Sequence, residues 1–345
     1  MPDSAIASIS PAAVRPPAAW SDASIRRHLV LGYRPGWQSL ADLNEIARHV
    51  SDLDPTIRTF IVPTTMRNSV SRKQAARLPT LVFSPGEMRG FSPLRGKVYH
   101  GWPMPKAEEV RRLTIAGVPV PRTVLLTPGL ELDRAVWGDF VIVKPTDLAT
   151  SSYGRGIQLM RTERVRYIAP QDYASDHPGR LGPMMVQQFV DTGETITCYR
   201  VLTLFGEPLY FQFNEMADPR VDLNAADEVI ERAPIANQSF TDKKRLLITE
   251  PDVLALARRA HEAIPEVPLK GVDILREIGT GKLYVIEVNC RGNTWHFSSA
   301  HMAATRKKEG AGVRARPPPP VRCHAHRCPR PGREDQRRGG ISPAR

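Results

Sequence analysis

The sequence lacks the features that mark membrane or secreted proteins. No apolar run approaches the roughly 18 to 20 residues that a membrane-spanning helix needs. Residues 1–24 have no basic start followed by an apolar core, so we predict a disordered leader rather than a secretory signal. Four cysteines in 345 residues are too few and too scattered for a disulfide framework. We therefore expect a cytoplasmic protein with no membrane partner.

Two common nucleotide-binding motifs are also missing. The segment "GYRPG" at residues 32–36 lacks the G-x-G-x-x-G spacing of a dinucleotide-binding turn. The sequence G-x-x-x-x-G-K-[ST], which cradles phosphates in P-loop proteins, does not occur. Any nucleotide site in this chain must therefore be built in another way.

The net charge of +12 does not indicate a nucleic-acid partner, because it is concentrated in one segment. Residues 306–345 hold twelve Lys and Arg against three Asp and Glu, so they carry nine of the twelve net positive charges. The rest of the chain is close to neutral and has no basic footprint for DNA or RNA.

The basic tail at residues 301–345 has too little apolar surface to order itself. Its "CHAHRC" segment is similar to a zinc cluster, but no structural context around it supports a metal site. The tail is rich in Arg, Pro, Gly and Ala, which GC-rich codons yield when read out of frame. Our hypothesis is that the reading frame slips just after about residue 303.

The remaining sequence divides into two predicted domains. Residues 25–103 read as strand, turn, helix and strand followed by two more strands, which predicts a small α/β domain. Residues 104–300 contain a short helix near residue 105, several strands, a helix near 250–264 and a final pair of strands. Within this second domain, before the helix near 250–264, we expect a polar loop at residues 214–244.

The last pair of strands, "GVDILRE" and "KLYVIEVN", predicts an antiparallel hairpin. A turn centred on Thr280 places Asp273 opposite Glu287, with Asn289 on the same face. Like charges opposed across a ladder destabilise it, so we expect a cation between them. Hard oxygen ligands suit Mg²⁺ better than zinc. The alternative is a pair of acids that face solvent.

Two lysines stand at positions suited to anion binding. Lys106 lies at the start of the predicted helix, after Pro105, where the helix dipole and an ammonium group favour an anion. The alternative is a solvated lysine neutralised by Glu108 and Glu109. Lys144 ends the strand "FVIVKP", where it either satisfies a carboxylate or holds an anion.

The segment after Lys144 favours an anion. The loop "TDLATSSYGRG" (residues 146–156) supplies hydroxyl groups, a cation and glycines, which let backbone N–H groups approach a ligand closely. A lysine, a polar loop and a magnesium site are the parts needed to bind and polarise a polyphosphate.

With these motifs in their observed order, the chain resembles the ATP-grasp enzymes over residues 104–298. That family includes D-alanine–D-alanine ligases, glutathione synthetases and glutamate ligases that modify a ribosomal protein. The resemblance implies an ATP-grasp fold in which two α+β lobes clamp ATP, preceded by a small α/β domain. It also implies ATP and Mg²⁺, or Mn²⁺ in its place, as cofactors.

The resemblance also assigns roles to residues of this sequence. Arg200 and Lys144 would act on the transferred group and the phosphates. Asp273, Glu287 and Asn289 would hold the metal. The nucleotide would be contacted by Lys106, Lys144, Ser151, Ser152, Gly154, Gly156, Gln188, Val190 and Glu194. Beyond the metal triad, Arg291, Trp295 and His296 would line an acceptor pocket, although Trp295 equally suits a core position.

The implied reaction is the ATP-dependent ligation of a carboxylate to an amine or thiol through an acylphosphate. Small-molecule carboxylates and amines would be the substrates. Two alternatives remain at this stage: a phosphotransferase that stops at a phosphorylated product, and an ATP-binding module without turnover. The sequence identifies neither the two substrates nor the oligomeric state.

Overall fold

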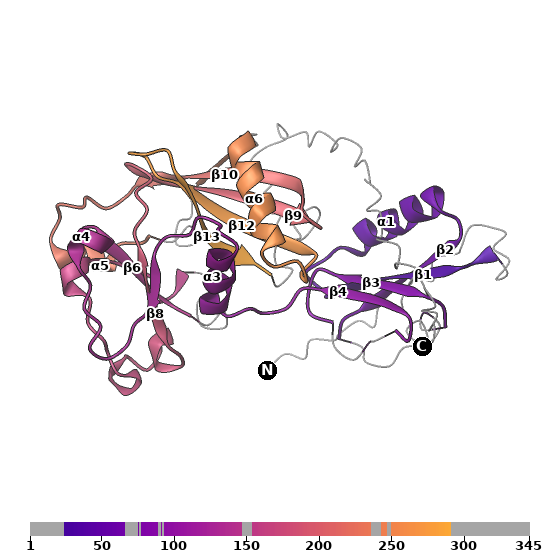
Figure 1. Cartoon of the computed structure of the whole chain (residues 1–345), viewed down its shortest axis with the longest axis horizontal. Coiled ribbons are helices and arrows are strands. Elements are labelled where there is room, and N and C mark those ends of the chain that lie inside the picture. Colours follow the sequence, from indigo (N-terminus) through magenta and orange to yellow (C-terminus); the bar gives the residue numbers. More distant parts are fainter. Residues whose placement is uncertain are drawn as a thin grey trace, which may run out of the picture.

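The computed structural model describes residues 24–65, 75, 77–88, 91, 93–146, 154–235, 243–246 and 250–290. They form three β-sheets with helices packed on them, so the predicted mixed α/β and α+β class is confirmed (Figure 1). The predicted leader, apart from Ser24, and the predicted tail lie outside the described residues. No helix in the described ranges is long and apolar enough to cross a membrane.

The first sheet is entirely parallel and has the strand order β2-β1-β3-β4. Its strands are β1 (Arg27–Tyr33), β2 (Ile57–Pro63), β3 (Thr80–Ser84) and β4 (Gly96–His100). Helix α1 (Leu40–Leu53) connects β1 to β2, as a parallel pair requires. The Oγ of Ser39 caps this helix by accepting a hydrogen bond from Ala41 N (3.1 Å).

The second sheet is antiparallel, with the order β5-β8-β6-β7. Its strands are β5 (Thr123–Leu125), β6 (Phe140–Pro145), β7 (Gln158–Arg161) and β8 (Met184–Gln188). This sheet has a hydrophobic core separate from those of the other two sheets, and that core includes Trp137, Val141 and Val186. The short helices near it are α4 (Arg134–Trp137), α5 (Asp227–Arg232), η3 (Thr162–Arg164), η4 (Pro170–Asp172) and η5 (Pro178–Arg180).

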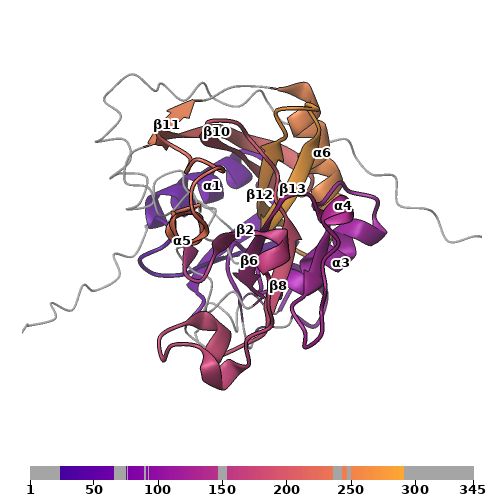
Figure 2. The same cartoon turned by 90° about the vertical axis from the view of Figure 1, so that its left-hand side faces the viewer.

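The third sheet is antiparallel and has the order β11-β10-β9-β12-β13. Its strands are β9 (Thr195–Leu204), β10 (Glu207–Pro219), β11 (Lys243–Leu246), β12 (Leu269–Arg276) and β13 (Leu283–Asn289). Helices α3 (Lys106–Ile115) and α6 (Pro251–Glu262) lie beside the β12–β13 hairpin (Figure 2). Their apolar side chains join those of the sheet in the largest buried cluster, around Leu113, Val201 and Leu256.

The prediction of a loop over residues 214–244 is wrong in part, because this range contains strand and helix residues. Strand β10 continues through Pro219, helix α5 begins at Asp227, and β11 begins at Lys243. The polar residues at 214–219 misled the prediction because an antiparallel strand can carry polar side chains wherever one face is not covered by apolar core. The predicted start of helix α3 is also wrong by one residue. Pro105 occupies the N-cap position of α3, and Lys106 is the first helical residue.

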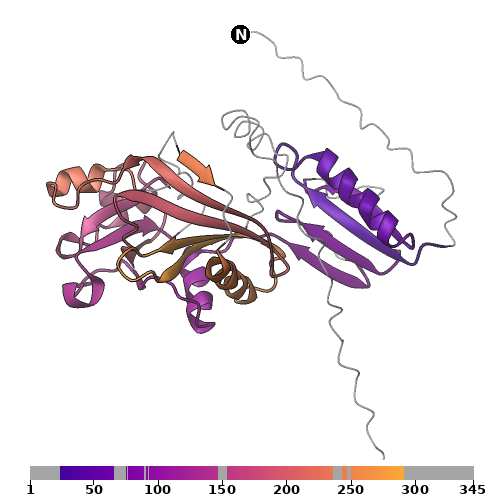
Figure 3. The ribbon, with the colours of Figure 1, turned by 90° about the horizontal axis from the view of Figure 1, so that it is seen from above.

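The first and third sheets share a buried cluster. Leu31 and Leu43 from the first domain pack with Leu202 and Leu269 from the third sheet. Close backbone packing joins the same two parts at Gly101, where a Cβ would collide with the carbonyl oxygens of Pro85 and Cys290. Only glycine fits this approach. Figure 3 shows α1 covering one face of the first sheet beside this junction.

The predicted register of the final hairpin is confirmed at the carboxylates. Asp273 pairs with Glu287, and Gly271 pairs with Asn289. Nearer the turn the register differs by one, because Ile274 pairs with Val285 and leaves Ile286 as an extra residue in β13. A bulge of this kind bends and twists a strand locally. The turn is therefore centred half a residue before Thr280, and the bulge restores the predicted pairing at the acids.

Lys270 lies in the core of the third sheet and is fully buried. Its Nζ donates hydrogen bonds to the carbonyl oxygens of His261 (2.6 Å) and Ile264, at the C-terminal end of α6. Burial lowers the pKa of Lys270 to about 7. A neutral amine has two N–H groups, so both carbonyl groups keep a donor after the proton is lost.

We predict that Lys270→Met changes how stability depends on pH. Between pH 7 and about 10 the folded protein has released this proton, while the unfolded chain retains it. The free energy of unfolding of the unsubstituted protein should therefore rise relative to that of the variant, by about 1.4 kcal/mol per pH unit. Urea unfolding from pH 6.5 to 9.5 measures this difference.

The exposed Lys97→Met is the matched control and should show no such pH-dependent difference. Parallel curves for the unsubstituted protein and Lys270→Met would show that Lys270 keeps its proton throughout this range.

Candidate active site

A row of charged side chains crosses the third sheet. Gln212 on β10 pairs with Arg200 on β9, Arg200 pairs with Asp273 on β12, and Asp273 pairs with Glu287 on β13. Directly opposed residues of neighbouring strands lie on one face of a sheet. The register therefore brings three residues of the predicted site, Arg200, Asp273 and Glu287, side by side. We call these three residues the charged row.

Arg200 and Asp273 form a two-bond ion pair. The Nε and Nη2 atoms of Arg200 donate to Oδ1 (2.7 Å) and Oδ2 (2.5 Å) of Asp273. The Nδ2 of Asn289 donates a further hydrogen bond to Asp273 Oδ2 (3.1 Å). Burial raises the pKa of Asp273, and the opposing effect of Arg200 offsets this only in part. Both carboxylate oxygens accept from a guanidinium, which is the arrangement of an ionised acid.

Lys106 extends the row beyond Glu287. Its Nζ lies 3.5 Å from Glu287 Oε1, and its side chain is almost completely buried. The alternative of a solvated Lys106 neutralised by its neighbouring glutamates is therefore wrong. Glu108 instead pairs with Arg111 and Arg112 on the outside of α3.

Lys144 reaches the same region from the second sheet. It is buried at the end of β6, and its Nζ donates to Oε1 of Gln187 (2.8 Å), whose Nε2 donates to Thr123 (3.1 Å). Among the described residues no carboxylate lies within ion-pairing distance of Lys144. Its hydrogen bond goes to a neutral amide, so its charge is not neutralised at contact distance. This favours the anion-binding alternative.

The two lysines and Glu287 affect one another electrostatically. Burial works to raise the pKa of Glu287, but Lys106, Lys144 and Arg200 together outweigh it and hold that pKa below its usual value. Burial, helped by the nearby Lys106, lowers the pKa of Lys144 to about 8. Both side chains therefore carry their charges at pH 7, inside the protein, where charge interactions are strong.

Glu109 belongs to this site and was missed in the sequence. It is buried, its Oε1 accepts a hydrogen bond from Val288 N (2.6 Å), and its Oε2 has no partner among the described residues. Burial, together with the nearby Glu287, raises the pKa of Glu109 to about 8. A signal was present: Glu109 lies one helical turn from both Lys106 and Leu113, so the three share a helix face.

Gln187 and the polar face of β10 were also missed. Gln212 Nε2 donates to Asn214 Oδ1 (2.6 Å), and Asn214 is paired with Cys198 in the register. Alternating polar residues at 212 and 214 indicate one polar face of a strand. The prediction of a loop from residue 214 onward concealed this pattern.

Protein side chains already supply the cations that the opposed carboxylates need. Arg200 and Lys106 flank the two acids, so the like-charge argument does not by itself require a metal. Among the described residues, no group of three or more His, Cys, Asp or Glu side chains is placed to hold a metal ion. Even so, Asp273, Glu287 and Asn289 offer hard oxygen donors on one face, a donor set that fits Mg²⁺.

The predicted phosphate loop is described only in part. Ser151 and Ser152 lie outside the described residues. Gly154 and Gly156 have φ angles of 74° and 69°, a backbone conformation that favours glycine. At its start, Thr146 O accepts a hydrogen bond from Lys106 N (3.1 Å), which ties the end of β6 to the first turn of α3.

The remaining residues predicted to contact the nucleotide, Gln188, Val190 and Glu194, do not form one cluster. Gln188 ends β8, with its N–H donating to Arg122 O (2.8 Å), and Val190 is buried. Glu194 precedes β9 and lines a cavity of about 400 Å³ with residues 219–224. It is six residues from Arg200, or roughly 20 Å along an extended strand. Arg291, Trp295 and His296 lie outside the described residues.

We predict that Glu109→Gln removes a pH-dependent loss of stability. With a folded pKa of about 8 and an ordinary value of 4.5, Glu109 stays protonated in the folded protein while the unfolded chain ionises. The free energy of unfolding should therefore fall between pH 5 and 8 by up to about 1.4 kcal/mol per pH unit in the unsubstituted protein, relative to the variant.

Glutamine keeps the oxygen that accepts from Val288 N. Thermal and urea unfolding across that pH range measure the effect, with the exposed Glu262→Gln as control. An unchanged pH profile in Glu109→Gln would mean that Glu109 ionises in the folded protein as it does in the unfolded chain.

Comparisons with known proteins give structural matches only. No family profile and no curated protein matches the sequence. The crystal structure of D-cycloserine synthetase DcsG is 15% identical, with a TM-score of 0.48 over 79% of this chain and 94% of that one. D-alanine–D-alanine ligase from Bacillus anthracis, complexed with ATP, is 16% identical, with a TM-score of 0.44 over 83% and 99%.

A third similar structure is ATP-grasp ligase PsnB complexed with minimal precursor, Mg and ADP. It is 16% identical, with a TM-score of 0.42 over 76% of this chain and 89% of that one. These matches report what the chain is similar to, at low identity and with modest structural overlap. At this level of identity, only the side chains of the site bear on function.

Proposed function

We propose that this protein is an ATP- and Mg²⁺-dependent ligase that joins a carboxylate to an amine or thiol through an acylphosphate. The observation that carries the proposal is the convergence of two buried lysines, Lys106 from α3 and Lys144 from the second sheet, on Glu287 of the third sheet. Three structural elements far apart in sequence thus place ionised groups at one position.

The balance of charge supports an anionic ligand. Lys106, Lys144 and Arg200 are cations, whereas Asp273 and Glu287 are the ionised acids. Glu109, with a pKa of about 8, is largely neutral at pH 7. One positive charge therefore remains in a buried region, where it attracts phosphate more strongly than it would in water.

The proposed roles follow from these positions. Lys106 and Lys144 bind phosphate groups, and the N-terminus of α3 adds its dipole to Lys106. Arg200 contacts the transferred group, which requires it to give up at least one of its two bonds to Asp273. Asp273, Glu287 and Asn289 hold Mg²⁺, which neutralises phosphate charge when it is bound.

A carboxylate substrate needs no general base, because it is already ionised at pH 7. The protein's contribution is to align this nucleophile with the phosphate and to neutralise charge as the phosphoryl group moves. In the proposed reaction the carboxylate oxygen forms a bond to the γ-phosphorus and ADP leaves. The amine or thiol then forms a bond to the acyl carbon, and inorganic phosphate leaves.

We predict that Lys144→Met lowers ATP-dependent ADP release by about 100-fold, because it removes a buried cation from the phosphates. The measurement is a coupled ADP assay across amino acids and small carboxylates, with and without added amines. Lys97→Met, on the exposed surface of β4, should retain full activity. A Lys144→Met variant as active as Lys97→Met would contradict the proposed phosphate contact.

ADP release that needs both a carboxylate and an amine or thiol supports a ligase. Release with the carboxylate alone, accompanied by a stable phosphorylated product, would instead indicate a phosphotransferase.

We also predict that Glu287→Gln raises the Mg²⁺ concentration needed for half-maximal ADP release by at least tenfold, because an amide oxygen carries no net charge for the metal. A Mg²⁺ titration after treatment with EDTA measures this. The half-buried Glu277→Gln, beside the turn of the same hairpin, is the control. Equal Mg²⁺ requirements in the two variants would remove Glu287 from the metal site.

A further inference from the structure

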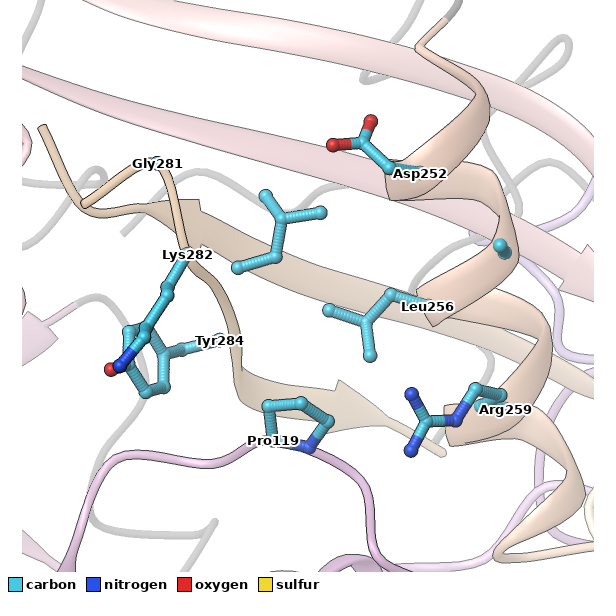
Figure 4. A pocket seen from close by; sticks show the side chains of 9 residues that line it. Pro119, Asp252, Leu256, Arg259, Gly281, Lys282 and Tyr284 are labelled. Carbon is cyan, nitrogen blue, oxygen red and sulfur yellow. The ribbon is translucent and has the colours of Figure 1, made fainter.

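A cavity of about 540 Å³ lies away from the charged row. It is bounded by α6, by the start of β13 with its preceding turn, and by the segment after α3 (Figure 4). No residue that we place in the candidate active site lines it. Its volume lies within the range of small-molecule sites in proteins.

The walls of this cavity are mainly apolar. Leu256 lines it from α6, Leu283 and Tyr284 from β13, and Pro119 from the opposite segment. The walls from Pro119 and β13 are joined, because Val285 N donates a hydrogen bond to Pro119 O (2.9 Å). A ligand would therefore meet a largely formed apolar surface, which favours an apolar body.

Two cations lie on opposite sides of the cavity. Arg259 extends from α6 and Lys282 from the turn before β13, with Pro119 between them (Figure 4). Arg259 donates one hydrogen bond to Gly117 O (2.5 Å), which leaves its charge in place. Within the described part of the chain, no carboxylate lies within ion-pairing distance of either Arg259 or Lys282.

The cavity's acid does not cancel these charges. Asp252, at the start of α6, is paired with Arg276 (2.9 Å), which also pairs with Glu250 (2.5 Å). Arg276 shares its single charge between Asp252 and Glu250, so these three groups together with Arg259 and Lys282 leave one net positive charge at the cavity. An apolar pocket with cations at its edge suits a ligand that has an apolar body and an anionic end.

We propose that this cavity is an accessory binding site for a small amphipathic carboxylate, such as an aromatic acid. Its apolar part lies against Leu256, Leu283 and Tyr284, and its carboxylate pairs with Arg259 or Lys282. The site is independent of the proposed ligase reaction, since it shares no side chain with the charged row.

The test uses the full chain and three probes. 3-Phenylpropionate has both parts, 3-phenylpropanamide lacks the charge, and propionate lacks the ring. Calorimetry or saturation-transfer NMR should detect 3-phenylpropionate, with affinity at least tenfold above that of either other probe. Equal affinity for the acid and the amide, or no detectable binding of the acid at 5 mM, would overturn the proposal.

Variants locate the binding. Lys282→Gln should weaken binding of 3-phenylpropionate by about threefold, and Lys282→Gln combined with Arg259→Gln by about tenfold, as expected for partly exposed ion pairs. Lys97→Gln should have no effect. Lys282 makes no interaction that α6 depends on, so the single variant remains informative if the double variant fails to fold.

Binding that excess ATP with Mg²⁺ abolishes competitively would place the acid in the candidate active site and overturn the proposal. Binding that persists at saturating ATP, and weakens in Lys282→Gln, supports it.

Discussion

The site depends on how buried charges compensate one another. Removing a charged group from water costs several kcal/mol unless an opposite charge or hydrogen bonds replace the water. In the charged row each acid has a cation beside it, with Arg200 next to Asp273 and Lys106 next to Glu287. Lys144 differs, because an amide satisfies its hydrogen bond without cancelling its charge. The opposite charges of the site therefore nearly cancel, and the net charge that remains is positive.

This arrangement explains why the site draws on two sheets and helix α3. The register of β9, β12 and β13 places Arg200, Asp273 and Glu287 side by side. Helix α3 brings Lys106, and it is fixed to β13 by the hydrogen bond from Val288 N to Glu109. The second sheet contributes Lys144 from its own core. No single segment could hold these charged side chains close together without the opposite charges that the others supply.

Much of this could be predicted where the information is local. The Asp273–Glu287 pairing follows from a short hairpin, and the bulge at Ile286 corrects for a turn centred half a residue away. The helix after Pro105 and the mixture of strands and a helix at residues 25–103 follow from the spacing of apolar residues and from the placing of Pro and Gly, whereas the parallel order of those strands was not predicted. The pairing of Arg200 with Asp273 could not be predicted, because it joins strands separated by more than 60 residues and depends on the order of strands in the sheet.

The same distinction explains the errors. Lys106 was open to a solvated interpretation because two glutamates follow it within three residues, whereas its carboxylate partner is Glu287 on β13, far along the chain. Opposed carboxylates indicated a missing cation, and protein side chains supply it. Glu109 was considered only as a neighbour that neutralises a solvated Lys106, although its position on the helix face indicates that it points inward. In each case a local explanation was sufficient in sequence but was replaced by a tertiary contact.

The packing at Gly101 limits which parts of the molecule can move apart. The first domain and the third sheet share a leucine cluster, and at Gly101 the backbone rests directly against the carbonyl group that follows β13. Separating them would expose that cluster and open a gap beside β13, the strand that carries Glu287 and Asn289. The second sheet has a core of its own, so tilting it would carry Lys144 toward or away from the acids while leaving both hydrophobic interiors intact.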